Sequence, residues 1–167
     1  MIYRIAQLIG FIAFFFSIIA YHLNKKDDIF KCMIISGFFN LIHYLLIGAY
    51  SGCITKVLSI IRDSIVVKKE KNNRLNSKIV LFILIVLYVI ASILTYEKLY
   101  SILPLIAAII YLIFIWNGSK ETVKKTAFFI YFLWLAYNIC VLSISGITSN
   151  IISIISTFIA VKRNKTT

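Results

Sequence analysis

The stretch YSGCITKVLSIIRDSIVVKKEK (residues 50–71) recurs 94 residues later as ISGITSNIISIISTFIAVKRNK (residues 144–165). The two stretches align without a gap, and polar residues match as well as apolar ones: Ser59, for example, falls on Ser153. Isoleucine-rich sequences match one another by chance, so the ungapped register and the polar matches carry more weight than the identities. Together they indicate that the chain contains an internal repeat.

The composition predicts that lipid is the main solvent of this protein. Of the 167 residues 61% are hydrophobic, and there is a single proline, whereas soluble domains average about 45 to 50% apolar residues. The net charge is +12, but the lysines and arginines lie mainly in short runs between apolar segments. Charge in that position sets membrane topology and meets anionic headgroups. We therefore expect an all-α, polytopic membrane protein in contact with the bilayer, and no nucleic-acid partner.

Seven membrane spans are predicted, because a helix needs about 20 mostly apolar residues to cross the hydrocarbon core. The third and the seventh are short and partly polar. The spans are expected near residues 3–22, 29–48, 51–67, 79–96, 100–117, 126–144 and 146–161.

The connections between these spans predict their orientation. With seven spans, the basic segments NKKDD, KKEKNNRLNSK, NGSKETVKK and KRNKTT all fall on one side, while only Arg4 and Lys98 are basic on the other. Basic loops stay in the cytoplasm. We expect a protein of the bacterial cytoplasmic membrane with its N-terminus outside and its C-terminus inside. The apolar N-terminal run is longer than that of a signal peptide and lacks an A-x-A site, so it is interpreted as an uncleaved first span.

The repeat extends over three spans in each copy. Residues 1–73 form the first three-helix repeat, residues 74–98 contain a linker helix, and residues 99–167 form the second repeat. Since both copies start outside, an odd number of crossings must join them, and the fourth span supplies that crossing. This predicts a 3+1+3 arrangement of parallel repeats related by an axis along the membrane normal.

This arrangement resembles the SWEET and PQ-loop transporter superfamily. Within it, the motifs IGFIAFFFSIIAYHLNKKDDIFK, NLIHYLLIGAYSGCITKVLSIIR and FLWLAYNICVLSISGIT look most like the bacterial YgjV-type inner-membrane proteins. The resemblance implies a fold and a transporter-like class, but no substrate. The chain departs from the superfamily by lacking the PQ dipeptide and the expected hinge prolines, because its one proline is Pro104.

Polar side chains on the second and sixth spans are candidates for a solute site. Asn40 and His43 share a helix face, and their repeat mates are Trp134 and Tyr137, with Asn138 close by. Polar groups in hydrocarbon face the bundle interior, a cavity or the interface. An indole and carboxamides can bind a small polar solute by stacking and hydrogen bonding. The alternative is that these residues, His43 above all, only connect helices.

The third span carries charged candidates. Lys56, Ser59 and Asp63 lie within about 60° of one another on the helix, with Arg62 beside them. Their mates on the seventh span form a neutral polar stripe of Asn150, Ser153, Ser156 and Thr157. The predicted substrate-binding residues are Asn40, His43, Ser59, Arg62, Asp63, Trp134, Asn138, Asn150 and Ser153.

The long side chains on this span leave an alternative open. Arg62 lies about 9 Å along the helix from Lys68 and can extend to the inner headgroups, and Lys56 can extend outward. Asp63 is too short to do so, and an unpaired carboxylate in a membrane is costly. It therefore requires a partner, and Lys56, Arg62 and His43 are available.

Three functions compete. The first is a transporter or channel for a small polar solute between the repeats, with an anionic solute as one option. The second is a non-transporting receptor or regulatory protein of the same fold. The third, a membrane enzyme, is not expected, because the chain has no HExxH or GxSxG motif and no paired carboxylates on one face. The scattered Cys32, Cys53 and Cys140 are interpreted as packing residues, and no metal or cofactor is expected. Whether the chain pairs with itself as a homo-oligomer stays open.

Overall fold

The computed structural model describes residues 1–23, 25–69, 72 and 74–163, and these form seven α-helices and one short 3-10 helix. A helix satisfies its own backbone hydrogen bonds, which is the requirement that hydrocarbon imposes on a spanning segment. The prediction of an all-α protein is confirmed. The elements are α1 (Ile2–His22), α2 (Lys26–Leu46), α3 (Tyr50–Lys69), α4 (Lys78–Leu94), η1 (Leu99–Ser101), α5 (Ile102–Trp116), α6 (Lys120–Cys140) and α7 (Ile144–Arg163).

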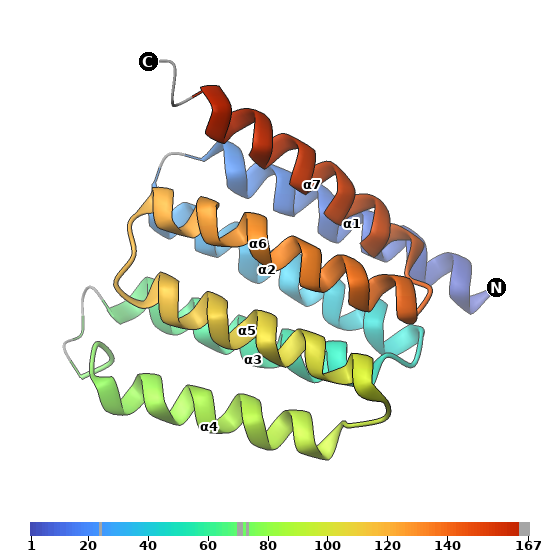
Figure 1. The fold of residues 1–167 in the computed structure, drawn as a ribbon, viewed down its shortest axis with the longest axis horizontal. Helices are drawn as coiled ribbons and strands as arrows, with labels where there is room; N and C mark the ends of the chain where they lie inside the picture. The colour runs from blue at the N-terminus through green and yellow to red at the C-terminus, as the bar shows by residue number, and fades with distance from the viewer. Residues whose placement is uncertain (24, 70–71, 73, 164–167) are drawn as a thin grey trace.

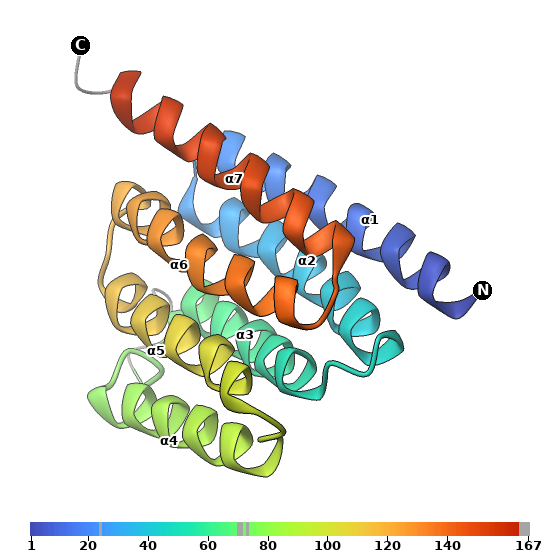
Figure 2. The ribbon, with the colours of Figure 1, turned by 45° about the vertical axis from the view of Figure 1, so that its right-hand side comes forward.

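The helices pack in two layers. Figure 1 shows α5, α6 and α7 in front of α3, α2 and α1, with α4 at one edge of the bundle. Within the layers, α2 packs against α1 and α3, and α6 packs against α5 and α7. Between the layers, α1 contacts α7 and α3 contacts α5, so the first helix of each half meets the last helix of the other. Both views place α1 and α7 together at the edge opposite α4 (Figures 1 and 2).

The helix α4 lies outside this reciprocal arrangement and contacts only α3 and α5 extensively. Leu84 and Tyr88 are its buried residues, and they join a cluster with Leu58 of α3 and Leu112 of α5. Most of its other apolar side chains are exposed, which suits a helix that faces lipid.

Successive helices run in opposite directions, so the connections gather at two ends of the bundle (Figure 1). The end that holds His22, Lys69 and Trp116 is also the end at which α7 finishes. Lys25 and Lys68 are exposed there. The described parts of the basic connections therefore lie at one end of the bundle.

Three described helical stretches are long and apolar enough to cross a membrane: Ile2–Ala20, Asp27–Leu46 and Leu99–Trp116. Lys78–Leu94, Lys125–Cys140 and Ile144–Thr157 are apolar but shorter. The helix α3 is as long as its neighbours, but its interior holds Lys56, Arg62 and Asp63, which lower its hydropathy.

Two helices begin three or more residues before the predicted spans. The helix α2 begins at Lys26 rather than residue 29, with two aspartates in its first turn that favour a helix N-terminus. The helix α6 begins at Lys120 rather than residue 126, because the Ser119 hydroxyl accepts a hydrogen bond from the Thr122 N–H and caps it. Hydropathy finds the apolar part of a helix and misses its charged first turns.

The turns after α2 and α6 share one geometry. The Ala49 N–H donates to the Tyr44 carbonyl at 2.9 Å, and 94 residues later the Ser143 N–H donates to the Asn138 carbonyl, also at 2.9 Å. The residue before each donor has a positive φ: 73° at Gly48 and 54° at Leu142. This is the Schellman helix stop, which favours glycine. The turn after α6 has the same geometry with Leu142 in the place of Gly48. Because this turn stops the helix, α6 ends at Cys140 and not at the predicted residue 144.

Candidate functional site

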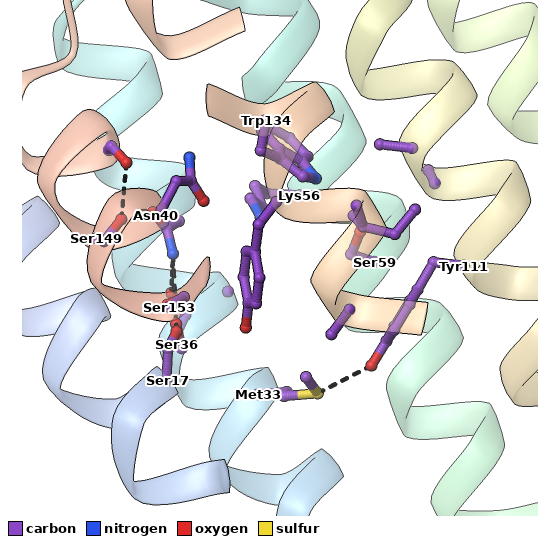
Figure 3. Close-up of a pocket in the computed structure, with 18 of the residues that line it drawn as sticks. Ser17, Met33, Ser36, Asn40, Lys56, Ser59, Tyr111, Trp134, Ser149 and Ser153 are labelled. Carbon is purple, nitrogen blue, oxygen red and sulfur yellow. Dashed lines mark hydrogen bonds between the residues drawn. The ribbon is translucent and has the colours of Figure 1, made fainter. Parts of the chain in front are cut away.

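The middle of the bundle contains a cavity of about 140 Å³, shown in Figure 3. Six helices line it, and α4 contributes no lining residue. A cavity of about 150 Å³ holds a molecule of the size of benzene. The space therefore suits a small solute of about six heavy atoms.

Most of the lining consists of residues that lie 94 positions apart. Nine such pairs supply eighteen of the twenty-four lining residues, so both halves of the chain contribute equivalent positions. The pairs are Phe14 and Ala108, Ser17 and Tyr111, Met33 and Ala127, Ser36 and Ile130, Gly37 and Tyr131, Asn40 and Trp134, Tyr44 and Asn138, Lys56 and Asn150, and Ser59 and Ser153.

Tyr44 and Asn138 are bonded to each other directly. The Tyr44 hydroxyl donates to Oδ1 of Asn138 at 2.9 Å, and both residues are almost fully buried. The contact therefore joins two positions that the 94-residue offset relates.

The neighbouring positions repeat this reciprocity. Nε2 of His43 is 2.8 Å from the hydroxyl of Ser143, in the turn after α6. Tyr137, 94 residues after His43, extends to the first turn of α3, where its hydroxyl accepts from the Gly52 N–H at 2.8 Å and bonds the Ser51 hydroxyl at 2.9 Å. The helices α2 and α6 are thus each tied to the segment that follows the other.

Arg62 and Asp63 form a buried ion pair at the cavity wall. Nε of Arg62 donates to Oδ1 of Asp63 at 2.8 Å, and the two side chains are only 7% and 4% exposed. The guanidinium carbon also lies 4.7 Å from the centre of the Tyr111 ring. Of the three partners considered for Asp63, the structure selects Arg62, and Arg62 points into the bundle instead of toward the headgroups.

Lys56 also points into the cavity. Its Nζ lies 4.0 Å from the centre of the Trp134 ring, which is a cation–π contact. Figure 3 shows the two side chains next to each other. The indole in turn stacks on Tyr44 with 5.9 Å between ring centres. Lys56 forms no ion pair with a carboxylate of the described residues, because Asp63 is bonded to Arg62 and Asp28 to Lys31.

The remaining polar lining differs between its two walls. On the wall formed by α1 and α2, the hydroxyls of Ser17 and Ser36 are 2.6 Å apart, and Nδ2 of Asn40 donates to the Ser36 carbonyl at 3.1 Å. On the α7 wall, Asn150 and Ser153 form no side-chain hydrogen bond with another described residue. Hydrogen-bonding capacity for a solute is thus concentrated on α7.

The family model of the bacterial inner membrane proteins of the YgjV type matches residues 4–167. This chain belongs to the YgjV family. The match covers nearly the whole chain, in agreement with the resemblance seen in its motifs, and it identifies a bacterial inner membrane protein. A search of the curated proteins and a search of the solved structures find no match.

Eight of the nine predicted site residues of this YgjV-family protein line one cavity. They are Asn40, Ser59, Arg62, Asp63, Trp134, Asn138, Asn150 and Ser153.

The ninth, His43, lies outside the lining. Both of its ring nitrogens are within 2.8 Å of a hydrogen-bond partner, Nδ1 with the Ala6 carbonyl and Nε2 with Ser143. The structure therefore places His43 as a connection between helices. Ser156 and Thr157, the mates of Arg62 and Asp63, are also outside the lining.

Other lining residues were missed in the sequence. Tyr44 and Tyr111 were not selected, nor were the positions that α1 and α5 contribute. The repeat could have identified Tyr44, because Tyr44 lies 94 positions before Asn138, which was selected. Ser17 of α1 is likewise a polar residue in an apolar helix. Among the described residues no group of three or more histidines, cysteines and carboxylates could hold a metal ion.

Proposed function

We propose that this YgjV-family protein is a transporter or channel for a small polar solute, which it binds in the cavity between two parallel three-helix repeats. The proposal includes a 3+1+3, SWEET-like architecture in which α4 is the linker. Its main support is the set of nine residue pairs, 94 positions apart, that line one cavity. Parallel-repeat transporters bind their substrates at the interface of the repeats, near the middle of the membrane.

The content of the cavity also supports a polar solute. A void left by imperfect packing would be lined by apolar groups, because cavities that stay empty are apolar. This one is lined by an ion pair, a lysine, three asparagines and five serines. Ionisable residues inside a membrane bundle typically mark a pathway for ions or substrates.

A matched pair of serine variants tests the proposal. Ser153 lines the cavity and is buried, whereas Ser156 is exposed on the same helix. The protein is reconstituted in liposomes, and uptake of a panel of labelled anionic, neutral and cationic small solutes is measured. We expect uptake of at least one class above that of empty liposomes, lowered several-fold by Ser153→Ala and unchanged by Ser156→Ala. The absence of uptake across the whole panel would contradict transport.

The proposed orientation has all seven helices in the membrane, with the N-terminus outside and the C-terminus in the cytoplasm. It rests on the gathering of the basic connections at one end of the bundle. A cysteine at Lys25, in a chain whose native cysteines are replaced by alanine, should react with an impermeant maleimide only after the membrane is opened. A cysteine in the turn after α2 should react in intact cells. Equal labelling of both would contradict the orientation.

A non-transporting receptor is the second candidate, and the exposed Lys25 and Lys68 at the basic end favour it. Such an end could bind an acidic partner or anionic lipid. Alanine at the basic-end lysines should then abolish function in the cell, while Ser153→Ala is harmless. Transport predicts the reverse pattern.

A further inference from the structure

The charges that line the cavity do not cancel. Lys56, Arg62 and Asp63 are its charged lining residues within the described chain. The pair of Arg62 and Asp63 is internally neutral, since its two charges are joined at 2.8 Å. This leaves the ammonium of Lys56, so the lining carries one net positive charge.

The ammonium of Lys56 lies where its positive charge requires a counter-charge. Its ammonium is held against the face of Trp134 and forms no ion pair with a carboxylate among the described residues. Asp63 lies close enough to attract it, but that carboxylate is bonded to Arg62. A cation that has left water with only such a shared counter-charge is costly in a bundle interior, and a contact with one aromatic face returns only part of that cost. A bound anion would supply the missing charge. A bound cation would be repelled, and a neutral solute would leave the charge uncompensated.

The other lining residues define what kind of anion fits. The opposite wall, α7, supplies Asn150 and Ser153, whose side chains have no hydrogen-bond partner among the described residues. The stacked rings of Trp134 and Tyr44 supply an apolar surface next to the ammonium. A cavity of about 140 Å³ has room for more than a monatomic ion. The site therefore combines one cation, neutral hydrogen-bonding groups and an apolar face.

We propose that the solute of this site is a small monocarboxylate of up to about six heavy atoms. Its carboxylate binds the ammonium of Lys56 and is hydrogen-bonded by Asn150 and Ser153, and its carbon chain lies against Trp134 and Tyr44. This inference rests on the proposed function for the location of the site, and adds the chemical class of the solute. Lys56 and Asn150 are 94 positions apart, so one half supplies the charge and the other half supplies an amide at the equivalent place.

A binding experiment with isosteric probes tests the class. The probes are butyrate, its uncharged isostere butyramide, n-butylammonium and chloride, each titrated onto the purified protein. The fluorescence of Trp134 reports binding in a Trp116→Phe background, because Trp116 is the other tryptophan. We expect butyrate to bind at least tenfold more tightly than each of the other three. Equal binding of butyramide, or tighter binding of n-butylammonium, would overturn the proposal. Equal binding of chloride would show that the site does not prefer a carboxylate to other anions.

Variants at Lys56 identify the charge that is responsible. Lys56→Met should weaken butyrate at least tenfold and leave butyramide unchanged, whereas Lys56→Arg should retain most of the affinity. Lys68→Met is the control, because Lys68 is an exposed lysine of the same helix. Butyrate binding that survives Lys56→Met would overturn the proposal.

Flux separates this inference from the proposed function. Uptake of butyrate into liposomes that Lys56→Met lowers would support both. Butyrate binding with no uptake of any solute in the panel would leave the binding class intact and refute transport. Uptake of neutral or cationic solutes without butyrate uptake would support transport and refute the monocarboxylate.

Discussion

The ion pair of Arg62 and Asp63 predicts that Asp63→Asn strongly destabilises the fold. The two charged atoms are 2.8 Å apart and both side chains are buried. Coulomb's law gives about 6 kcal/mol of attraction at this separation with an effective dielectric constant of about 20. Removing one partner leaves the guanidinium buried without a counter-charge, and such losses cost about 3 to 5 kcal/mol. We expect a decrease in the free energy of unfolding within that range.

A double variant separates the cost of the lone charge from the loss of packing. Replacing both members by apolar residues, Arg62→Met with Asp63→Leu, removes the uncompensated charge and should be much less destabilised than Asp63→Asn alone. Asp28→Asn is the matched control, because Asp28 pairs with Lys31 at 3.1 Å on the surface, where the two side chains are 43% and 62% exposed. Exposed pairs contribute about 0 to 1 kcal/mol.

The assay is reversible unfolding by SDS in mixed micelles, followed by circular dichroism. Two results would refute the reasoning. One is a loss below about 1 kcal/mol for Asp63→Asn, which would mean that water reaches Arg62 freely. The other is a double variant as unstable as the single one, which would mean that the pair acts through packing.

Three further predictions concern the contacts between the halves and the repeated turn. Tyr44→Phe removes the hydrogen bond to Asn138 and should lower the free energy of unfolding by about 0.6 to 1.7 kcal/mol in the same assay; no change would mean that the bond is not a stabilising contact. Gly52→Ala would bring a methyl group to 2.8 Å from the Tyr137 ring, and we expect a loss of about 1 to 3 kcal/mol, which Tyr137→Phe would not relieve because the ring carbon is also within that distance. Leu142→Gly should raise the melting temperature, because an exposed leucine with φ of 54° costs about 1 to 2 kcal/mol that glycine avoids; a lower melting temperature would show that the leucine side chain outweighs this strain.

The sequence was sufficient for the class of the protein and for the register of its repeat. An apolar chain in lipid has no water to satisfy its backbone, so helices follow from composition alone. The offset of 94 residues also anticipated the helix bounds, since α2 and α6, and α3 and α7, begin and end that far apart. Helical periodicity placed Ser59 and Asp63 on one face of α3, and both line the cavity.

Tertiary structure decided which face meets which neighbour. Periodicity states that Asn40 and His43 share a face, but the rotation of α2 in the bundle turns Asn40 into the cavity and His43 onto Ala6. The long side chains of Arg62 and Lys56 have rotamers that reach either the headgroups or the interior. The sequence is compatible with both directions. The rings of Tyr111 and Trp134, which come close to Arg62 and Lys56 only after packing, select the interior. Local sequence therefore determined the helices, their polar stripes and the pairing of Arg62 with its neighbour Asp63. The direction of each long cationic side chain depended instead on contacts between residues far apart in the chain.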